Sequence, residues 1–291
     1  MAYMKQGQWQ ESGNPSELDH SDNFDHLSIL EKDRFHLYVS YGCPFAHRAI
    51  LAISLLGLDK YITVSSVAPL KDKNGWEFNA EFPDPIQSND FLYQVYRDAK
   101  EDYSGRVSVP VLWDKKLKTI VSNDSLAITE WLVTQKISHQ TINLLPENLQ
   151  EKIKQQCTWI NEHLNNLPFK AGFTNNQTQY EEATSAFFHN LRALDDRLAT
   201  NRFYNGDQLT LSDVLLIPTL IQFELVYYTH FKLNCHPLSY FNNIQRYVID
   251  VMNNKNINST FHLDFIKQTY FVGQPALNPS GLIPVGPTLS W

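Results

Sequence analysis

The sequence is organised around residues 38–48, which read YVSYGCPFAHR. Upstream, residues 34–39 are rich in β-favouring side chains, and downstream residues 49–56 form an apolar run typical of a buried helix. Cys43 is therefore predicted to lie on a strand-to-helix turn. Pro44 falls where the first helical residue would be, a position at which its missing N–H is not needed.

Cys43 has the predicted surroundings of a reactive thiol. Backbone N–H groups and the positive dipole end at a helix start favour a thiolate, so we expect a lowered pKa and a nucleophilic sulfur. The alternative is a small buried hydrophobe, as many free cysteines are. Position 46 is Ala, so no Cys-x-x-Cys pair exists, and a thiol that resolves a disulfide on Cys43 must come from outside this motif.

Composition narrows the class of protein. A chain of 291 residues is long enough for about two domains, and its 43% apolar content can fill their cores. The net charge of −7, with no basic stripe, argues against a nucleic-acid partner. Three widely separated cysteines, Cys43, Cys157 and Cys235, are typical of a reducing compartment.

No targeting or membrane segment is predicted. Residues 1–28 are polar and acidic and lack the apolar core of a signal peptide. The longest apolar run, residues 214–228, is interrupted by Pro218, Gln222 and Glu224, which indicates a core helix and no membrane span. We expect a soluble, cytoplasmic protein without a membrane partner.

The order of predicted elements indicates an α/β domain followed by an all-α domain. Residues 34–138 read β-α-β-α-β-β-α, with a parallel pair between the strands at 34–39 and 61–68, which is the order of a thioredoxin-like domain. Before it we expect an extended surface arm, residues 1–33. After it come a polar linker at 139–147, an all-helical domain at 148–271 and a loop-like tail at 272–291.

Two helix starts are predicted in the second domain. The capping boxes Thr178–Glu181 and Thr210–Asp213 each place a hydroxyl three residues before an acid. The second opens the most apolar helix, which should be the spine of the domain. Further helices are expected at 149–164, with Cys157 on the buried face, at 240–252 and at 259–271.

Three features near Cys43 could hold a ligand. Pro110 interrupts a predicted strand at 107–114, and one geometry that accommodates it is a cis peptide, which would leave the N–H and C=O of Val109 free to pair with an extended ligand. The long loop 69–88 offers Trp76, either as a ligand contact or as a core anchor. The helix start at Asn123–Ser125 suits a carboxylate, although ordinary N-capping needs the same residues.

The sequence gives little support for a nucleotide site, a metal site or a Cys-His hydrolase. The glycines form no phosphate-binding loop, and His, Asp, Glu and Cys show no zinc spacing, so neither a nucleotide nor a metal is expected. A Cys-His hydrolase would need His47, for which no orienting acid or amide is evident. We therefore expect His47 to cover the helix surface.

Taken together, these motifs resemble the glutathione transferase superfamily, and within it the Xi class, the glutathionyl-hydroquinone reductases. The resemblance covers about residues 34–287. It is carried, besides residues 38–48, by Gly75–Phe78, Val109–Asp114, Ile120–Ser125, Lys170–Phe173, Gly206–Thr210, Tyr227–Phe231, Tyr270–Phe271, Asn278–Gly281 and Gly286–Pro287.

The resemblance implies an all-helical glutathione transferase C-terminal domain, a homodimer, and a cysteine-type, omega-like enzyme that uses glutathione as cosubstrate. Cys43 would attack the sulfur of a glutathionyl-hydroquinone, and a second glutathione would reduce the mixed disulfide. Tyr270 would bond the hydroxyl of the aromatic substrate. The implied glutathione-binding residues are Phe45, Trp76, Val109, Asp124 and Ser125.

The chain departs from the family pattern at four places. Phe45 stands where Trp is usual, Asp124 where Glu is usual, and Phe169 where a second substrate Tyr is usual; the aromatic and Arg-containing motif of the arm is missing. Phe169 cannot donate a hydrogen bond. Two alternatives therefore stay open: a conventional glutathione S-transferase that conjugates, and a non-catalytic thiol-binding module of the same fold.

Overall fold

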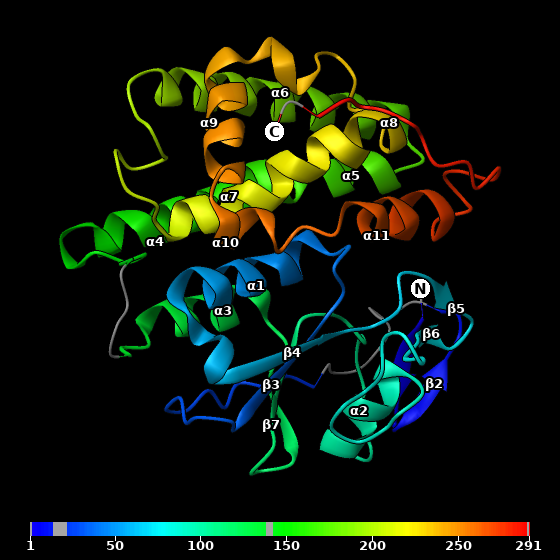
Figure 1. The fold of residues 1–291 in the computed structure, drawn as a ribbon. Helices are drawn as coiled ribbons and strands as arrows, with labels where there is room; N and C mark the ends of the chain where they lie inside the picture. The colour runs from blue at the N-terminus through cyan, green and yellow to red at the C-terminus, as the bar shows by residue number, and fades with distance from the viewer. Residues whose placement is uncertain (1, 14–21, 138–141, 290) are drawn as a thin grey trace. The chain divides into compact units, whose positions relative to one another are not determined.

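The structure, a computed structural model, describes residues 2–13, 22–137, 142–289 and 291 (Figure 1). The chain divides into two compact units, Met1–Gln135 and Lys136–Trp291. Of the predicted linker at 139–147, residues 139–141 lie outside the described residues, as do residues 1 and 14–21 of the predicted arm.

A four-stranded mixed sheet forms the centre of the first unit. Its strands are β3 (Phe35–Val39), β4 (Ile62–Ser66), β7 (Val111–Asp114) and β8 (Thr119–Ser122), in the order β4-β3-β7-β8. The predicted parallel pairing of β3 with β4 is confirmed, and β7 runs antiparallel to both β3 and β8. Every residue of β3 is buried, as expected of a central strand covered on both faces.

Three helices complete this thioredoxin-like unit. Helix α1 (Pro44–Leu56) packs against α3 (Ser125–Thr134), whereas α2 (Leu92–Ala99) contacts β8; a short 3₁₀ turn, Leu58–Lys60, precedes β4 (Figure 1). The predicted turn is confirmed, because β3 ends at Val39 and Pro44 is the first residue of α1. The helix predicted over 89–101 is shorter at both ends.

The strand predicted over 107–114 begins only at Val111. The Val109–Pro110 peptide bond is cis, as one sequence interpretation proposed, and it lies before the strand. Proline has no N–H to donate to a sheet ladder, so regular pairing starts after it. β7 is also an interior strand between β3 and β8, so the Val-Pro segment precedes the strand rather than forming a sheet edge.

The predicted extended arm contains a hairpin. Strands β1 (Tyr3–Lys5) and β2 (Gln8–Gln10) pair antiparallel through a turn at Gln6 and Gly7, whose φ angles of 49° and 74° are both positive, as a type I′ turn requires. Met4 is fully buried and exchanges backbone hydrogen bonds of 2.8 and 3.0 Å with Gly105. The arm is thus folded onto the first unit.

The predicted loop 69–88 also carries a hairpin, formed by β5 (Lys71–Asp72) and β6 (Gly75–Trp76). Gly75 has a φ of 86°, and a Cβ added there would lie 2.8 Å from the Trp9 ring. Glycine is therefore needed at position 75 both for the backbone angle and for the close approach of the arm.

The second unit is built from helices, and no strand is found among its described residues. They are α4 (Gln150–Ile160), α5 (Leu167–Phe173), α6 (Gln177–Ala199), α7 (Leu211–Gln222), α8 (Tyr228–His230), α9 (Asn242–Met252), α10 (Lys255–Asn258) and α11 (Leu263–Lys267). Helical π-turns extend α4, α7 and α11 at Asn161–Asn165, Phe223–Tyr227 and Gln268–Val272, and 3₁₀ turns lie at Glu147–Leu149 and Leu238–Tyr240. Helix α5 was not predicted.

Helix α7 forms the core of the second unit, as predicted. The predicted capping box is present: the Asp213 carboxylate accepts from the Thr210 N–H at 2.8 Å. All twelve residues of α7 are buried. The segment Leu211–His230 is long and apolar enough to cross a membrane by composition, but its most apolar window is 89% buried inside the unit, which is typical of a core helix in a soluble protein.

The other predicted capping box is wrong. Helix α6 begins at Gln177, and Asn176 caps it by accepting from the Gln179 N–H at 3.0 Å. Asparagine is a strong N-cap residue, and Asn176 lies two residues before the predicted box. Cys157 is buried in the core, as predicted.

Candidate active site

Cys43 is the N-cap residue of α1. Its backbone is extended, with φ −91° and ψ 115°, and its carbonyl accepts the His47 N–H at 3.0 Å, which begins the helix. The thiol lies 3.8 Å from the Val109 carbonyl oxygen, to which it donates. The helix start and the Val-Pro segment, 66 residues apart in sequence, therefore meet at the sulfur.

The predicted lowering of the Cys43 pKa is wrong. Burial raises the pKa of the thiol above its ordinary value, and this outweighs the opposing effects of the Ala46 and Phe45 N–H groups and of the positive charges on Arg48 and Lys71. Desolvation disfavours the charged thiolate. The sequence shows the helix start but not how far the fold removes the sulfur from water.

A cavity of about 570 Å³ opens beside the sulfur. It brings together three of the predicted site residues, Cys43, Trp76 and Val109. The side chain of Trp76 is only 8% exposed and so anchors the hairpin, as one interpretation expected. It also lines the cavity, and its contact with a ligand stays a prediction. The remaining lining residues are Ala2, Trp9, Glu11, Lys71, Asp72, Lys73, Gly75, Arg106, Val107 and Ser108.

One wall of this cavity comes from the N-terminal arm, which sequence reasoning missed. The Trp9 indole N–H donates to the Lys73 carbonyl at 2.9 Å, and its ring stacks on Tyr93 with centroids 5.3 Å apart. The turn at Gln6–Gly7, with a Gln-Gly pair between short alternating stretches, was the signal that could have predicted the hairpin. Nothing local indicated which side of the domain Trp9 would contact.

The other predicted glutathione-binding residues do not line this cavity. Asp124 is the N-cap of α3, and its Oδ1 accepts from the Leu126 and Ala127 N–H groups at 2.8 and 2.9 Å. Arg48, which is 2% exposed, links the other two: its Nη1 lies 3.5 Å from the Ser125 hydroxyl, and its guanidinium lies 4.7 Å from the Phe45 ring centroid. Capping, the alternative to anion binding, is therefore present at Asp124.

His47 is fully buried and does not cover the helix surface as expected. Among residues 2–13, 22–137, 142–289 and 291 the structure contains no group of three or more His, Cys, Asp or Glu side chains placed to hold a metal ion.

Tyr270, in the second unit, belongs to a buried hydrogen-bonded group. Its hydroxyl donates to the Gln222 side-chain oxygen at 2.9 Å, and the Tyr227 hydroxyl donates to the same oxygen at 2.8 Å. Gln222 and Tyr227 are fully buried, and Tyr270 is 3% exposed. One amide oxygen thus orients two phenols.

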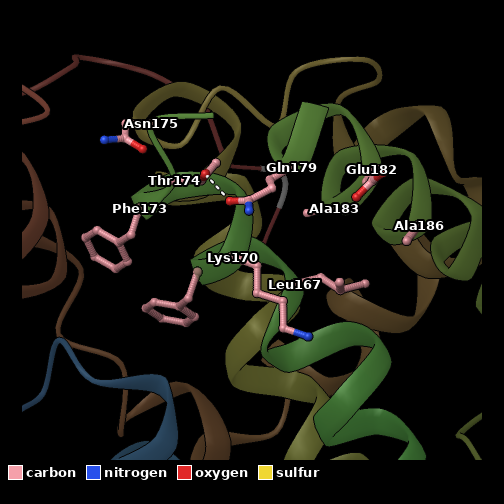
Figure 2. A pocket seen from close by; sticks show the side chains of 10 residues that line it. Leu167, Lys170, Phe173, Thr174, Asn175, Gln179, Glu182, Ala183 and Ala186 are labelled. Atoms are coloured by element: carbon pink, nitrogen blue, oxygen red, sulfur yellow. Dashed lines mark hydrogen bonds between the residues drawn. The ribbon is translucent and has the colours of Figure 1, made fainter. Parts of the chain in front are cut away.

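Phe169 packs edge-on against Tyr227 and Phe231, at centroid distances of 5.7 and 5.6 Å. It also lines a second cavity of about 680 Å³ between α5 and α6 (Figure 2). Figure 2 shows Phe173 at one end of this cavity and Ala186 at the other, with a 2.8 Å hydrogen bond from Thr174 to Gln179 at its rim. Tyr270 is not among the residues that line it.

Comparisons with known proteins agree with this architecture. A family model described as glutathione S-transferase, N-terminal domain, matches residues 42–135, and one described as glutathione S-transferase, C-terminal domain, matches residues 177–248. The chain is 42% identical over 265 residues to the glutathionyl-hydroquinone reductase YqjG of Escherichia coli, covering 89% of this chain and 81% of that protein. It is 36% identical over 262 residues to the glutathionyl-hydroquinone reductase PcpF of Sphingobium chlorophenolicum, covering 88% and 84%.

Solved structures of Xi class transferases and of YqjG are also similar to this chain. A Xi class transferase from Natrialba magadii has a TM-score of 0.94 at 34% identity, covering 100% of this chain and 94% of that one. The glutathione-bound structure of YqjG from Escherichia coli has a TM-score of 0.89 at 37% identity, covering 99% and 96%.

Proposed function

The chain belongs to the glutathione S-transferase superfamily, in its Xi class of glutathionyl-hydroquinone reductases, and from this premise we propose that it removes glutathione from S-glutathionyl-hydroquinones through a mixed disulfide on Cys43. The observation that carries the proposal is the free Cys43 thiol at the start of α1, lining a cavity large enough for a peptide-like thiol. Glutathione is the cosubstrate, and a relative of this fold is solved with glutathione bound.

The reaction balances with glutathione alone. The Cys43 thiolate attacks the sulfur of the thioether, so a sulfur–sulfur bond forms, the carbon–sulfur bond breaks, and its electron pair stays on the ring carbon, which takes up a proton. A second glutathione thiolate then attacks the mixed disulfide, which releases oxidised glutathione and restores Cys43. Overall the ring carbon gains two electrons, and the thioether sulfur and the sulfur of the second glutathione each lose one as they form the disulfide. Position 46 is Ala, so this chain supplies no local thiol for the second step.

The cavity supports part of the predicted glutathione site. Trp76 offers an aromatic wall, and the Val109 carbonyl already accepts from the Cys43 thiol, so a peptide could pair with the Val109 backbone beside the sulfur. Phe45, Asp124 and Ser125 remain proposed contacts. Asp124 and Ser125 are supported by their place at the start of α3, where the helix dipole favours a carboxylate. Phe45 is linked to Ser125 through Arg48.

Tyr270 is proposed to hydrogen-bond the hydroxyl of the aromatic substrate. The hydroxyl of Tyr270 donates to Gln222, so the bond it would offer to a phenolic O–H is that of an acceptor. Phe169, which has no hydroxyl, cannot contribute such a bond. Replacing Tyr270 by Phe should lower turnover about tenfold, which corresponds to about 1.4 kcal/mol of transition-state stabilisation.

The test of the proposal is steady-state turnover of a glutathionyl-hydroquinone in the presence of glutathione, followed by the appearance of free hydroquinone. Cys43→Ala should reduce turnover to background, whereas Cys235→Ser, a matched change at an exposed cysteine, should leave it unchanged. Undiminished turnover in Cys43→Ala would contradict the mechanism. Conjugation of glutathione to a chlorinated nitrobenzene, without reduction of the thioether, would instead indicate a conventional transferase.

A cytoplasmic location and a homodimer are also proposed. The three cysteines form no disulfide, which supports a reducing compartment, because an accessible thiol such as Cys235 survives there. The family resemblance supports the dimer. A molar mass of 33.7 kDa from light scattering would contradict the dimer.

A further inference from the structure

The Cys43 cavity contains five charged side chains, three basic and two acidic. They are Lys71, Lys73, Arg106, Glu11 and Asp72. The reaction proposed above needs negative charge on the Cys43 sulfur, and burial of that sulfur opposes the charge. A positive group placed in the same cavity would offset this cost. Three basic side chains line this cavity, and they differ in whether the fold holds them in one position.

Lys71 is the cation that the fold fixes in position. It pairs directly with Trp76 across the β5–β6 hairpin, so the two side chains lie on the same face of the hairpin. The Lys71 ammonium nitrogen lies 4.1 Å from the Trp76 ring centroid, within the range of a cation–π contact. Both residues line the cavity with Cys43. No ion pair joins Lys71 to a carboxylate of the described residues.

The other charges are placed differently. Arg48 also acts on Cys43, but it is buried against Phe45 and Ser125 and lies outside the cavity lining. Asp72 follows Lys71 in the strand, so its side chain points to the opposite face, and its Oδ1 accepts the Asn74 N–H in the turn.

Lys73, Arg106 and Glu11 are exposed to solvent, and so is Lys71, so exposure does not distinguish these three from it. None of the three forms a cation–π contact or an ion pair within the described part of the chain.

We propose that Lys71 is a positioning residue for the reaction, whose ammonium group, held on the face of Trp76, stabilises the negative charge that the Cys43 sulfur carries before it attacks and after the mixed disulfide is reduced. This assignment rests on the proposed function for its role in turnover. It concerns the free thiol as well, so it can be tested without any aromatic substrate.

The experiment measures alkylation of Cys43 by iodoacetamide from pH 6 to pH 10, with the modified peptide quantified by mass spectrometry. In this reaction the thiolate displaces iodide, so the rate follows the thiolate fraction. All variants carry Cys235→Ser, which removes the exposed competing thiol. Lys71→Met should slow alkylation at pH 7 about threefold to tenfold and move the midpoint of the pH profile upward, whereas Lys71→Arg should keep both near the parent values.

Two matched lysines complete the design. Lys73→Met removes a charge from the rim of the same cavity, and Lys60→Met removes one from an exposed 3₁₀ turn elsewhere in the first unit. Both should change the profile less than Lys71→Met does. Lys71→Glu, which reverses the charge, should move the midpoint further than Lys71→Met and keeps the test decisive if Lys71→Met folds poorly.

An unchanged profile in Lys71→Met and Lys71→Glu would overturn the proposal, and so would an equal shift in Lys73→Met or Lys60→Met, because the effect would then be one of net charge. The pH profile of Cys43 alkylation tests the role of Lys71 independently of the proposed enzyme activity. A shift in Lys71→Met together with no reduction of glutathionyl-hydroquinone would reject the function and keep the electrostatic role. Reduction of glutathionyl-hydroquinone together with an unshifted profile in Lys71→Met would keep the proposed function and reject the electrostatic role of Lys71.

Discussion

In the first unit the charged side chains around Cys43 lie at the edge of an open cavity, with Lys71, Lys73 and Arg106 forming no ion pair among the described residues. In the second unit the comparable polar groups are enclosed and bonded to one another. The Asp213 carboxylate is fully buried and accepts four hydrogen bonds, and the Gln222 oxygen is fully buried and accepts two.

The enclosed polar groups and the charged groups at the cavity edge contribute differently to fold stability and to ligand binding. A polar group enclosed by its own partners cannot exchange them for a ligand without loss, so it stabilises the fold. A charged group at a cavity edge gives little stability, because solvent screens it, but it remains able to meet an incoming charge. Substitutions of Asp213 and Gln222 should therefore act mainly on unfolding, and substitutions in the Cys43 cavity mainly on binding and reactivity.

The largest effect on stability is expected at Asp213. Its oxygens accept from the Tyr204 N–H, the Thr210 N–H, the Thr210 hydroxyl and the Tyr247 hydroxyl at 2.8 to 3.0 Å. Asp213→Ala leaves several buried donors without this acceptor and should lower the free energy of unfolding by about 3–5 kcal/mol. Tyr247→Phe, which removes one of the bonds, should cost about 1 kcal/mol. Urea unfolding monitored by circular dichroism measures both.

A smaller loss is expected at Gln222. Gln222→Leu removes the acceptor shared by Tyr227 and Tyr270 and should lower the free energy of unfolding by about 2–4 kcal/mol. Removing the two hydroxyls as well, in the triple variant with Tyr227→Phe and Tyr270→Phe, should restore much of this loss, because buried polar groups are then no longer left unpaired. A triple variant less stable than Gln222→Leu would show that the hydroxyls depend on other partners.

At the cavity wall the expected effect moves from stability to binding. Trp9→Ala removes an aromatic wall and should raise the KM for glutathione about tenfold, which is about 1.4 kcal/mol, with a smaller effect on unfolding. Gly75→Ala should act in the same direction, because its Cβ would lie 2.8 Å from the Trp9 ring on a backbone with φ of 86°. Trp9→Phe, which keeps the ring but not the N–H, is the matched control. An unchanged KM in Trp9→Ala would exclude the arm from the binding site.

Whether a feature could be predicted from the sequence depended on how local its cause is. The strand-to-helix turn at Cys43 follows from Pro44 and the flanking apolar residues, and the start of α7 follows from Thr210 and Asp213, all within a few positions. The glutathione transferase fold was implied by the family resemblance that many such motifs carry together. These predictions are confirmed by the structure and by the comparisons.

The features that were missed depend on distant parts of the chain. Trp9 reaches the cavity through contacts with Lys73 and Tyr93, more than sixty positions away, and the Gln222 oxygen meets Tyr270 across 48 positions. The pKa of Cys43 depends on how much water the whole first unit excludes. Periodicity and capping patterns carry no information on such packing, so the enclosed hydrogen bonds and the cavity wall appear only in the folded chain.

The smallest expected effect is on the pH dependence of Cys43 alkylation. It tests whether burial or the neighbouring positive groups dominate the pKa of the thiol. Burial raises the pKa of its thiol, so the thiolate fraction is low at neutral pH and grows as the pH rises. Alkylation of Cys43 by iodoacetamide should therefore increase steadily from pH 7 to pH 9, with its midpoint above about 8.5, the ordinary value for cysteine. A rate that is already constant below pH 7 would mean that the helix start and the nearby cations outweigh burial. Cys43 would then be largely a thiolate at neutral pH, stabilised by the helix start and by the positive charges of the cavity.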